Sequence, residues 1–210
     1  MKNLIIQTIF RKISKKLEII YEKLQGLDFI LVIHPRDLGL DEAVVVRGSP
    51  SGNIFLTNLL RDLHITEADS ILDIGCSKGS ALRRMSAFPF RRVNGLELSE
   101  KLAGIAKENF RKLKKDNVDI YNVDARHFKH YGNYNFFYFY NPFPEVIMAD
   151  VIEKLSEQVG NAEITIIYNN PTCHQLLVNN GFVKFREYPD EWGNGIYVYS
   201  NKPTTSRLIK

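Results

Sequence analysis

The fold is decided by the stretch Ser70-Ile71-Leu72-Asp73-Ile74-Gly75-Cys76-Ser77-Lys78-Gly79-Ser80. Its first half is apolar and follows a polar turn, which predicts a short buried strand over residues 70–75. A helical pattern begins after Gly79 and continues through residues 81–85. Because Gly75 and Gly79 carry no Cβ, a ligand can approach the backbone of the turn that joins strand to helix. The stretch therefore predicts a ligand-binding loop at the end of a strand.

Two common phosphate-binding patterns do not fit this loop. A Walker loop ends in Gly-Lys-Ser/Thr, and residues 78–80 have these residue types in a different order. The dinucleotide fingerprint G-x-G-x-x-G is absent.

A third pattern fits. Asp73-x-Gly75-x-Ser77-x-Gly79 resembles motif I (D-x-G-x-G-x-G) of the class I S-adenosylmethionine-dependent methyltransferases, with Ser77 in place of the middle glycine. The resemblance implies that this loop, with Cys76, passes under the methionine part of S-adenosyl-L-methionine. That cofactor is a sulfonium cation without phosphate, so an acidic strand end suits it electrostatically.

Two further segments carry the same resemblance. Residues 92–99 predict a second strand that ends at Glu97, 18 residues after Gly79, and a carboxylate at that distance binds ribose hydroxyls in Rossmann-type sites. Glu97, followed by Leu98, matches the ribose-binding acid of the family. Residues 118–125 predict a third strand, and Asp124-Ala125 fall where the family contacts adenine.

Strand and helix patterns alternate from residue 70, which predicts an α/β fold with a parallel sheet covered by helices on both faces. Further strands are expected at residues 136–140, 162–168, 182–188 and 196–200, and helices at 53–63, 99–113, 145–159 and 172–180. The resemblance covers about residues 50–200. It implies a Rossmann-like methyltransferase domain whose seven-stranded, mostly parallel sheet has the order 3-2-1-4-5-7-6 and a terminal antiparallel strand.

In open α/β sheets, ligands bind beyond the carboxyl ends of the strands. The strand over 136–140 leads into Asn141-Pro142-Phe143-Pro144, which is similar to the (Asn/Asp)-Pro-Pro-(Tyr/Phe) motif of amino-methyltransferases. This resemblance implies that Asn141, Pro142 and Phe143 border the transferred methyl group. Phe143 stands where the motif has its second proline, so oxygen and nitrogen acceptors both stay open. The alternative is that Asn141 caps the following helix.

Other residues after the strands are weaker candidates. Asn170 follows the strand over 162–168, and Trp192 lies in the predicted terminal hairpin, where it could stack on a planar substrate or pack the hairpin. A hydroxyl acceptor would need a general base, for which His127, His130 and His174 are candidates. No cluster of metal ligands is apparent, and none is expected.

The first 49 residues predict a helical extension and cap. Apolar residues recur at helical spacing over 4–24 up to Gly26, and the opposite face is mostly basic. This helix could cap the domain with its apolar face in the core, or contact an anionic membrane or an acidic partner. Short strands are expected at 28–33 and 43–46, and Arg47 could pair with the cofactor carboxylate. Residues 201–210 predict a polar tail.

Composition limits the class of protein. The 210 residues contain two cysteines, Cys76 and Cys173, and no apolar run long enough to span a bilayer, so we expect a cytoplasmic protein with the option of a peripheral membrane site. The net charge of +4 resides within residues 1–25, and the neutral remainder disfavours a large nucleic-acid interface.

We therefore expect a methyltransferase of the EC 2.1.1 class that methylates an oxygen or nitrogen of a small-molecule, glycan or lipid-linked acceptor. The alternatives are an N-methyltransferase acting on nucleic acid or protein, and a non-catalytic scaffold that binds the cofactor.

Overall fold

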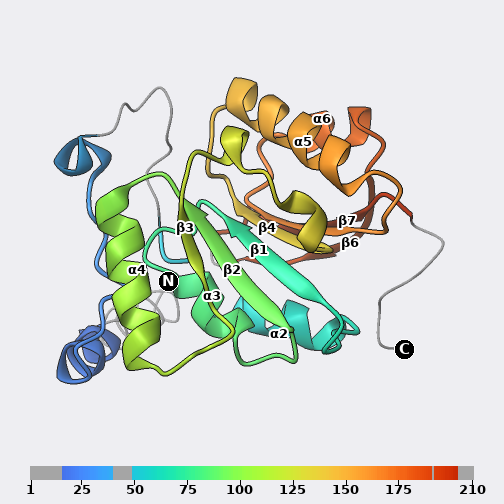
Figure 1. Ribbon diagram of the computed structural model, residues 1–210. Helices are drawn as coiled ribbons and strands as arrows, with labels where there is room; N and C mark the ends of the chain where they lie inside the picture. Colours follow the sequence, from blue (N-terminus) through green and yellow to red (C-terminus); the bar gives the residue numbers. More distant parts are fainter. Residues whose placement is uncertain (1–15, 40–48, 191, 203–210) are drawn as a thin grey trace, which may run out of the picture.

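A computed structural model describes residues 16–39, 49–190 and 192–202 (Figure 1). Its centre is a seven-stranded sheet of order β3-β2-β1-β4-β5-β7-β6, as the sequence predicts. The first five strands pair in parallel, and β7 runs antiparallel to both β5 and β6. The strands are β1 (Ser70–Ile74), β2 (Arg92–Glu97), β3 (Ile120–Asn122), β4 (Phe136–Tyr140), β5 (Thr165–Asn169), β6 (Val183–Tyr188) and β7 (Ile196–Ser200).

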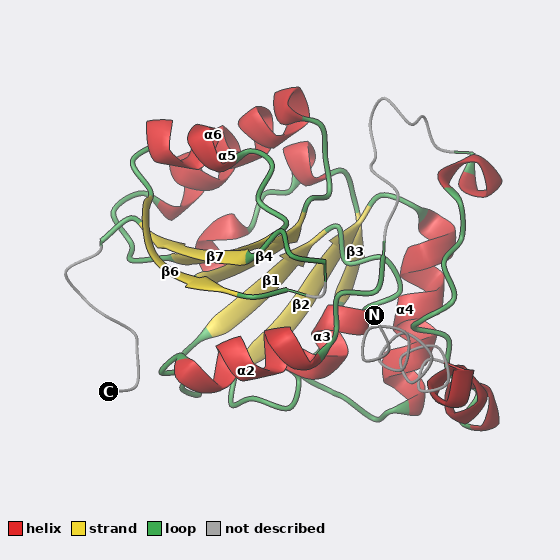
Figure 2. Cartoon of the chain, turned by 180° about the vertical axis from the view of Figure 1, so that it is seen from behind, coloured by secondary structure: helices red, strands yellow, loops and turns green. Residues whose placement is uncertain are grey.

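Helices cover both faces of this sheet (Figure 2). They are α2 (Ile54–Asp62), α3 (Ser80–Met85) and α4 (Glu100–Lys112) on one face, and α5 (Glu145–Val159) and α6 (His174–Asn179) on the other. Short 3-10 turns are η1 (Pro35–Leu38), η2 (Ala125–His127) and η3 (Tyr131–Asn133). Within the described residues, no helix combines the length and apolarity needed to cross a bilayer.

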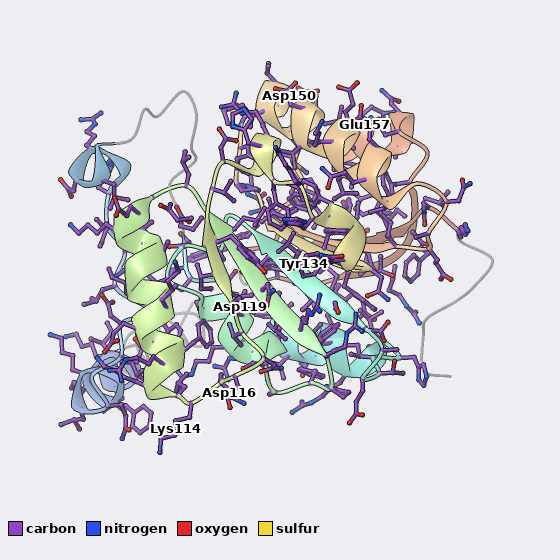
Figure 3. The ribbon with its side chains drawn as sticks, in the orientation of Figure 1. Lys114, Asp116, Asp119, Tyr134, Asp150 and Glu157 are labelled. Carbon is purple, nitrogen blue, oxygen red and sulfur yellow. The ribbon has the colours of Figure 1, made fainter. Side chains whose placement is uncertain are left out.

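The central strand β4 shows why both faces need helices. Phe136 and Tyr138 belong to the core under α2 to α4, whereas Phe137 and Phe139 belong to the core under α5 and α6. Successive side chains of a strand point to opposite faces, so an uninterrupted aromatic strand must be covered twice. The covering helices are amphipathic in turn, and Figure 3 shows exposed Asp150 and Glu157 on the side of α5 that faces away from the sheet.

Polar residues cap two helices, α2 and α4, whose starts lie within one residue of those expected from the sequence. Asn53 caps α2, because its Oδ1 accepts hydrogen bonds from the backbone N–H groups of Phe55 and Leu56. Ser99 caps α4 through a hydrogen bond from the Leu102 N–H.

The strand expected at 28–33 is wrong. The backbone N–H groups of Phe29 and Ile30 donate to the Glu22 carboxylate at 3.0 and 3.2 Å, so a side chain takes the place of a neighbouring strand. Residues 43–46 and Arg47 lie outside the described part of the chain.

The helix expected over 4–24 is described from residue 16, and it ends before Gly26, whose φ of +66° suits glycine. Most of its apolar residues do not pack in the core. Leu17 and Leu24 are 61% and 80% exposed, whereas Glu22 is 3% exposed. The face that contacts the domain carries Ile19, which packs against the core, and Glu22, which supplies hydrogen-bond acceptors that the backbone of residues 29–30 requires.

Candidate cofactor site

One cavity lies beyond the carboxyl ends of the parallel strands β1, β2 and β4 and gathers most of the predicted residues. The predicted residues that line it are Asp73, Gly75, Cys76, Ser77, Glu97, Leu98, Asp124, Ala125, Asn141, Pro142 and Phe143. Segments 70–80, 92–99, 120–125 and 136–143 thus meet at one edge of the sheet. This is the edge at which open α/β sheets bind ligands.

The loop after β1 has the backbone that the sequence predicts. Gly75 has a φ of +87°, and a Cβ there would lie 2.8 Å from the Cβ of Pro142. The two motifs are therefore in contact, and glycine is needed where they meet. Ser77, which stands in place of the middle glycine of the motif, adopts a φ of +50°, in the left-handed region that favours glycine.

Gly79, unlike Gly75, has a role in helix packing and not in the cavity lining. It does not line the cavity, it precedes α3 with a φ of +86°, and a Cβ there would lie 2.5 Å from the ring of Phe110. Its lack of a side chain lets α3 start against α4.

Glu97 joins the ends of β1 and β2. Its two carboxylate oxygens accept 2.8 Å hydrogen bonds from the backbone N–H groups of Ser77 and Ser99. Each oxygen keeps a second lone pair for another donor. Burial raises the pKa of Glu97, although these backbone hydrogen bonds act in the opposite direction.

Asp73 is the second buried acid of the cavity. Burial, and then the charge of Glu97, raise the pKa of Asp73 well above its usual range. Burial and the same two acids also raise the pKa of the Cys76 thiol. Within residues 16–39, 49–190 and 192–202, neither acid has a basic partner within 4 Å. The cavity is therefore suited to a ligand with positive charge.

Asp124 is paired, unlike these two acids. Its carboxylate accepts hydrogen bonds from the Arg126 guanidinium, the shortest of 2.7 Å, and the pKa of Asp124 is lowered by this contact. Asp124 and Arg126 both line the cavity, and a contact of Asp124 with adenine stays a prediction.

Asn141 is held in a strained conformation where the end of β4 meets the cavity. Its φ is +41°, and its Oδ1 accepts a 2.6 Å hydrogen bond from the Thr172 hydroxyl. The alternative that Asn141 caps α5 is wrong, because the residue in the cap position is Pro144 and no side chain caps this helix.

The tentative substrate residues and the candidate bases lie outside the cavity lining. Trp192 is 58% exposed in the turn between β6 and β7, and Asn170 follows β5. His127 and His130 are exposed, and the Nδ1 of His174 lies 2.8 Å from the Tyr199 hydroxyl. The acidic groups that line the cavity, and that could accept a proton when ionised, are instead those of Asp73, Cys76, Glu97, Asp124 and Tyr140.

Comparisons with known proteins agree with this geometry. Residues 71–162 match the model of a family described as "Methyltransferase domain". These residues resemble a methyltransferase domain, and the sheet that contains them has the fold of S-adenosylmethionine-dependent methyltransferases. No curated protein matches the sequence.

Solved structures show the same methyltransferase fold. A SAM-dependent methyltransferase from Aquifex aeolicus is 16% identical with a TM-score of 0.56, over 69% of this chain and 87% of that one. The mitomycin 7-O-methyltransferase MmcR is 15% identical with a TM-score of 0.57, over 70% of this chain, which spans about half (52%) of that protein. Magnesium protoporphyrin IX methyltransferase from Synechocystis PCC 6803, solved with bound SAM, is 15% identical with a TM-score of 0.50, over 70% of this chain and 74% of that one.

The cavity also has a wall formed by N-terminal segments that the sequence patterns did not place at the site. Phe29, residues 31–33, Leu38 and residues 49–51 all line it, although they precede the matched domain. For residues 49–51, the signal in the sequence was the expectation that the neighbouring Arg47 could pair with the cofactor carboxylate.

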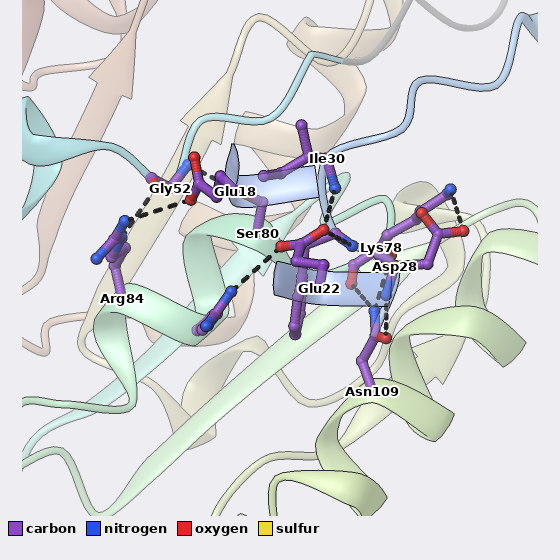
Figure 4. Close-up of polar contacts among 11 residues, drawn as sticks. Glu18, Glu22, Asp28, Ile30, Gly52, Lys78, Ser80, Arg84 and Asn109 are labelled. Atoms are coloured by element: carbon purple, nitrogen blue, oxygen red, sulfur yellow. Dashed lines mark hydrogen bonds and ion pairs between the residues drawn. The ribbon is translucent and has the colours of Figure 1, made fainter. Parts of the chain in front are cut away.

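A polar network fixes this N-terminal wall to the cofactor loop (Figure 4). The ammonium group of buried Lys78 lies 2.6 Å from the Asp28 carboxylate, so the charge of this lysine is neutralised from the N-terminal side. Buried Asn109 of α4 accepts from the Asp28 N–H and donates to the carbonyls of Asp28 and Lys78. The wall and the loop after β1 are thereby held as one unit.

Proposed function

We propose that this protein is a methyltransferase that binds S-adenosyl-L-methionine and transfers its methyl group to an oxygen or nitrogen of an acceptor. The observation that carries the proposal is the pair of buried, unpaired acids Asp73 and Glu97 beside a glycine loop in one cavity. Ionised carboxylates in that position favour a cation and disfavour phosphate.

The residues present fit this cofactor. Gly75 and Ser77 give the loop an open backbone, and the free lone pairs of Glu97 are available for ribose hydroxyls. When bound, the sulfonium supplies a methyl group that is already activated for displacement, so the protein has mainly to align the acceptor with it.

Residues 140–143 border the acceptor end in this proposal. Asn141 would hold the acceptor, and its hydrogen bond from Thr172 would fix the orientation of its amide. An acceptor amine reacts when neutral, whereas a hydroxyl needs a base such as Tyr140, Asp73 or Glu97 within reach.

The cavity walls favour an acceptor with an apolar part. Leu31 and Val32 are 45% and 40% exposed and line the cavity with Leu38, Phe143 and Ile147. The basic residues that line it, Lys78 and Arg126, are both paired with acids. These features support a small molecule or a lipid-linked molecule over a nucleic acid, whose phosphates require free cations.

Calorimetric titration with S-adenosylmethionine and S-adenosylhomocysteine tests the cofactor. We expect saturable binding that Asp73→Asn weakens, with Asp119→Asn, an exposed position directly before β3, as the control. Transfer of a labelled methyl group into cell extracts, fractionated as lipid, glycan, nucleic acid and protein, tests the acceptor. Binding without transfer to any fraction would favour the non-catalytic scaffold, and absence of binding would refute the proposal.

A further inference from the structure

The helix over residues 16–24 presents an apolar surface to solvent. This surface, the outer helix face, consists of Leu17, Ile20, Tyr21 and Leu24, each more than half exposed. The four residues recur at spacings of three and four and therefore form one stripe. Single exposed apolar residues are common, but a continuous stripe on one helix indicates a contact surface.

Contacts on the opposite side fix this orientation. Glu22 is buried, accepts from the N–H groups of Phe29 and Ile30, and forms a 3.2 Å ion pair with Arg83 (Figure 4). Glu18 lies 3.9 Å from Arg84. The outer helix face thus points away from the domain because the acidic residues of the helix bind to it.

The charges beside the stripe select one kind of partner. Glu18 and Glu22, the acids of residues 16–24, are both paired with arginines of α3, so neither of them balances the charges of the exposed Lys16 and Lys23. An apolar stripe with exposed lysines is typical of helices that lie in the interface of an anionic membrane.

The sequence before residue 16 extends this pattern. In the sequence, Ile6, Phe10 and Ile13 precede Leu17 at spacings of four, three and four, which is the same periodicity as that of the stripe. Residues 1–15 contain four basic residues and no acidic residue. A basic, apolar segment of this length is complementary to anionic lipid, whereas two copies of the face would bring like charges together.

We propose that the outer helix face docks on the surface of an anionic phospholipid bilayer. The proposal is independent of the methyl-transfer chemistry, because it rests on the helix and not on the cavity. Burial of the apolar stripe supplies affinity, and the lysines supply the preference for anionic lipid.

Co-sedimentation of the full chain with lipid vesicles tests this. We expect binding to vesicles of phosphatidylcholine mixed with phosphatidylglycerol, much weaker binding to pure phosphatidylcholine, and a loss of binding as salt increases. The triple variant Leu17→Asn, Ile20→Asn, Leu24→Asn should lower the partition by more than about tenfold. The double variant Val178→Asn, Val183→Asn, which removes exposed apolar residues on α6 and β6, is the matched control and should bind like wild type.

Circular dichroism and S-adenosylmethionine titration of the triple variant check that the domain is intact. If the wild type does not bind anionic vesicles, or if the triple variant binds them as well as the wild type does, the proposal is overturned. Self-association in ultracentrifugation that the triple variant abolishes, without vesicle binding, would assign the face to a second copy and equally overturn it. Cofactor titration of the wild type separates these outcomes from a failure of the proposed function.

Discussion

Asn109 offers a sharp test of how the N-terminal wall is held, because one buried side chain makes three hydrogen bonds there. The change Asn109→Ala leaves the N–H and carbonyl of Asp28, and the carbonyl of Lys78, without these partners. Each such hydrogen bond contributes about 0.5 to 1.5 kcal/mol to stability. The two bonds to Asp28 are partly buried, so water can replace them in part, whereas the bond to Lys78 is buried.

We therefore expect Asn109→Ala to lower the free energy of unfolding by about 2 to 3 kcal/mol. For a chain of this size, that corresponds to a fall of about 4 to 12 °C in melting temperature. S-adenosylmethionine should also bind more weakly, because the carbonyl of Lys78 belongs to the loop after β1.

Urea unfolding followed by fluorescence and circular dichroism measures the first effect, and calorimetry measures the second. Lys107→Ala, an exposed position on the same helix, is the control for the change in helix propensity. If Asn109→Ala and Lys107→Ala differ by less than about 0.5 kcal/mol, the network does not hold the wall and the argument fails.

Three further predictions concern the cavity. Burial raises the pKa of Asp73 and of Glu97, so their neutral forms stabilise the empty fold at low pH and this contribution is lost as pH rises through the raised pKa values. A bound cation favours the ionised forms of these acids, so S-adenosylmethionine should bind more tightly as pH rises, and its binding should release protons. Calorimetric titrations in buffers of different ionisation enthalpy measure that proton release, and an uptake of protons would contradict the prediction. Gly75→Ala should lower the free energy of unfolding by about 1 to 3 kcal/mol and weaken the binding of the cofactor, because the φ of residue 75 is positive and the added Cβ would lie against Pro142 after β4. An unchanged midpoint of urea unfolding would count against this contact. Thr172→Val should lower turnover of an identified acceptor by about tenfold with cofactor affinity unchanged, since Asn141 loses its hydrogen-bond donor, and Thr172→Ser should restore turnover.

The positions of the strands and the lining of the cavity were predictable because their signals are local, whereas the order of the strands was implied by the family resemblance. Short apolar runs mark the central strands, and the glycine loop, Glu97 and Asn141 stand directly at strand ends. The topology of a parallel sheet then brings those ends together, so no long-range contact had to be guessed.

The N-terminal wall was not predictable for the opposite reason. Residues 28–33 have the apolar composition of a strand, but their backbone hydrogen bonds go to Glu22 and Asn109, which no periodicity reveals. The pattern over 16–24 predicts an amphipathic helix, yet it cannot say which face turns inward. The carboxylate of Glu22, which is buried with its backbone partners, turns its own side of the helix toward the domain, against the usual preference of a helix to bury its apolar face.

The ion pair between Lys78 and Asp28 has a consequence for where this protein can be divided. A shortened chain starting at residue 50 would keep every strand of the sheet but would leave the ammonium group of a buried lysine without its counter-charge. It would also lack Phe29 and Ile30, so the core residues under α2 to α4 that pack against them would be exposed. We therefore expect that a fragment folds on its own only if it extends upstream to include Glu22, because the balance of buried charges reaches beyond the strands of the sheet.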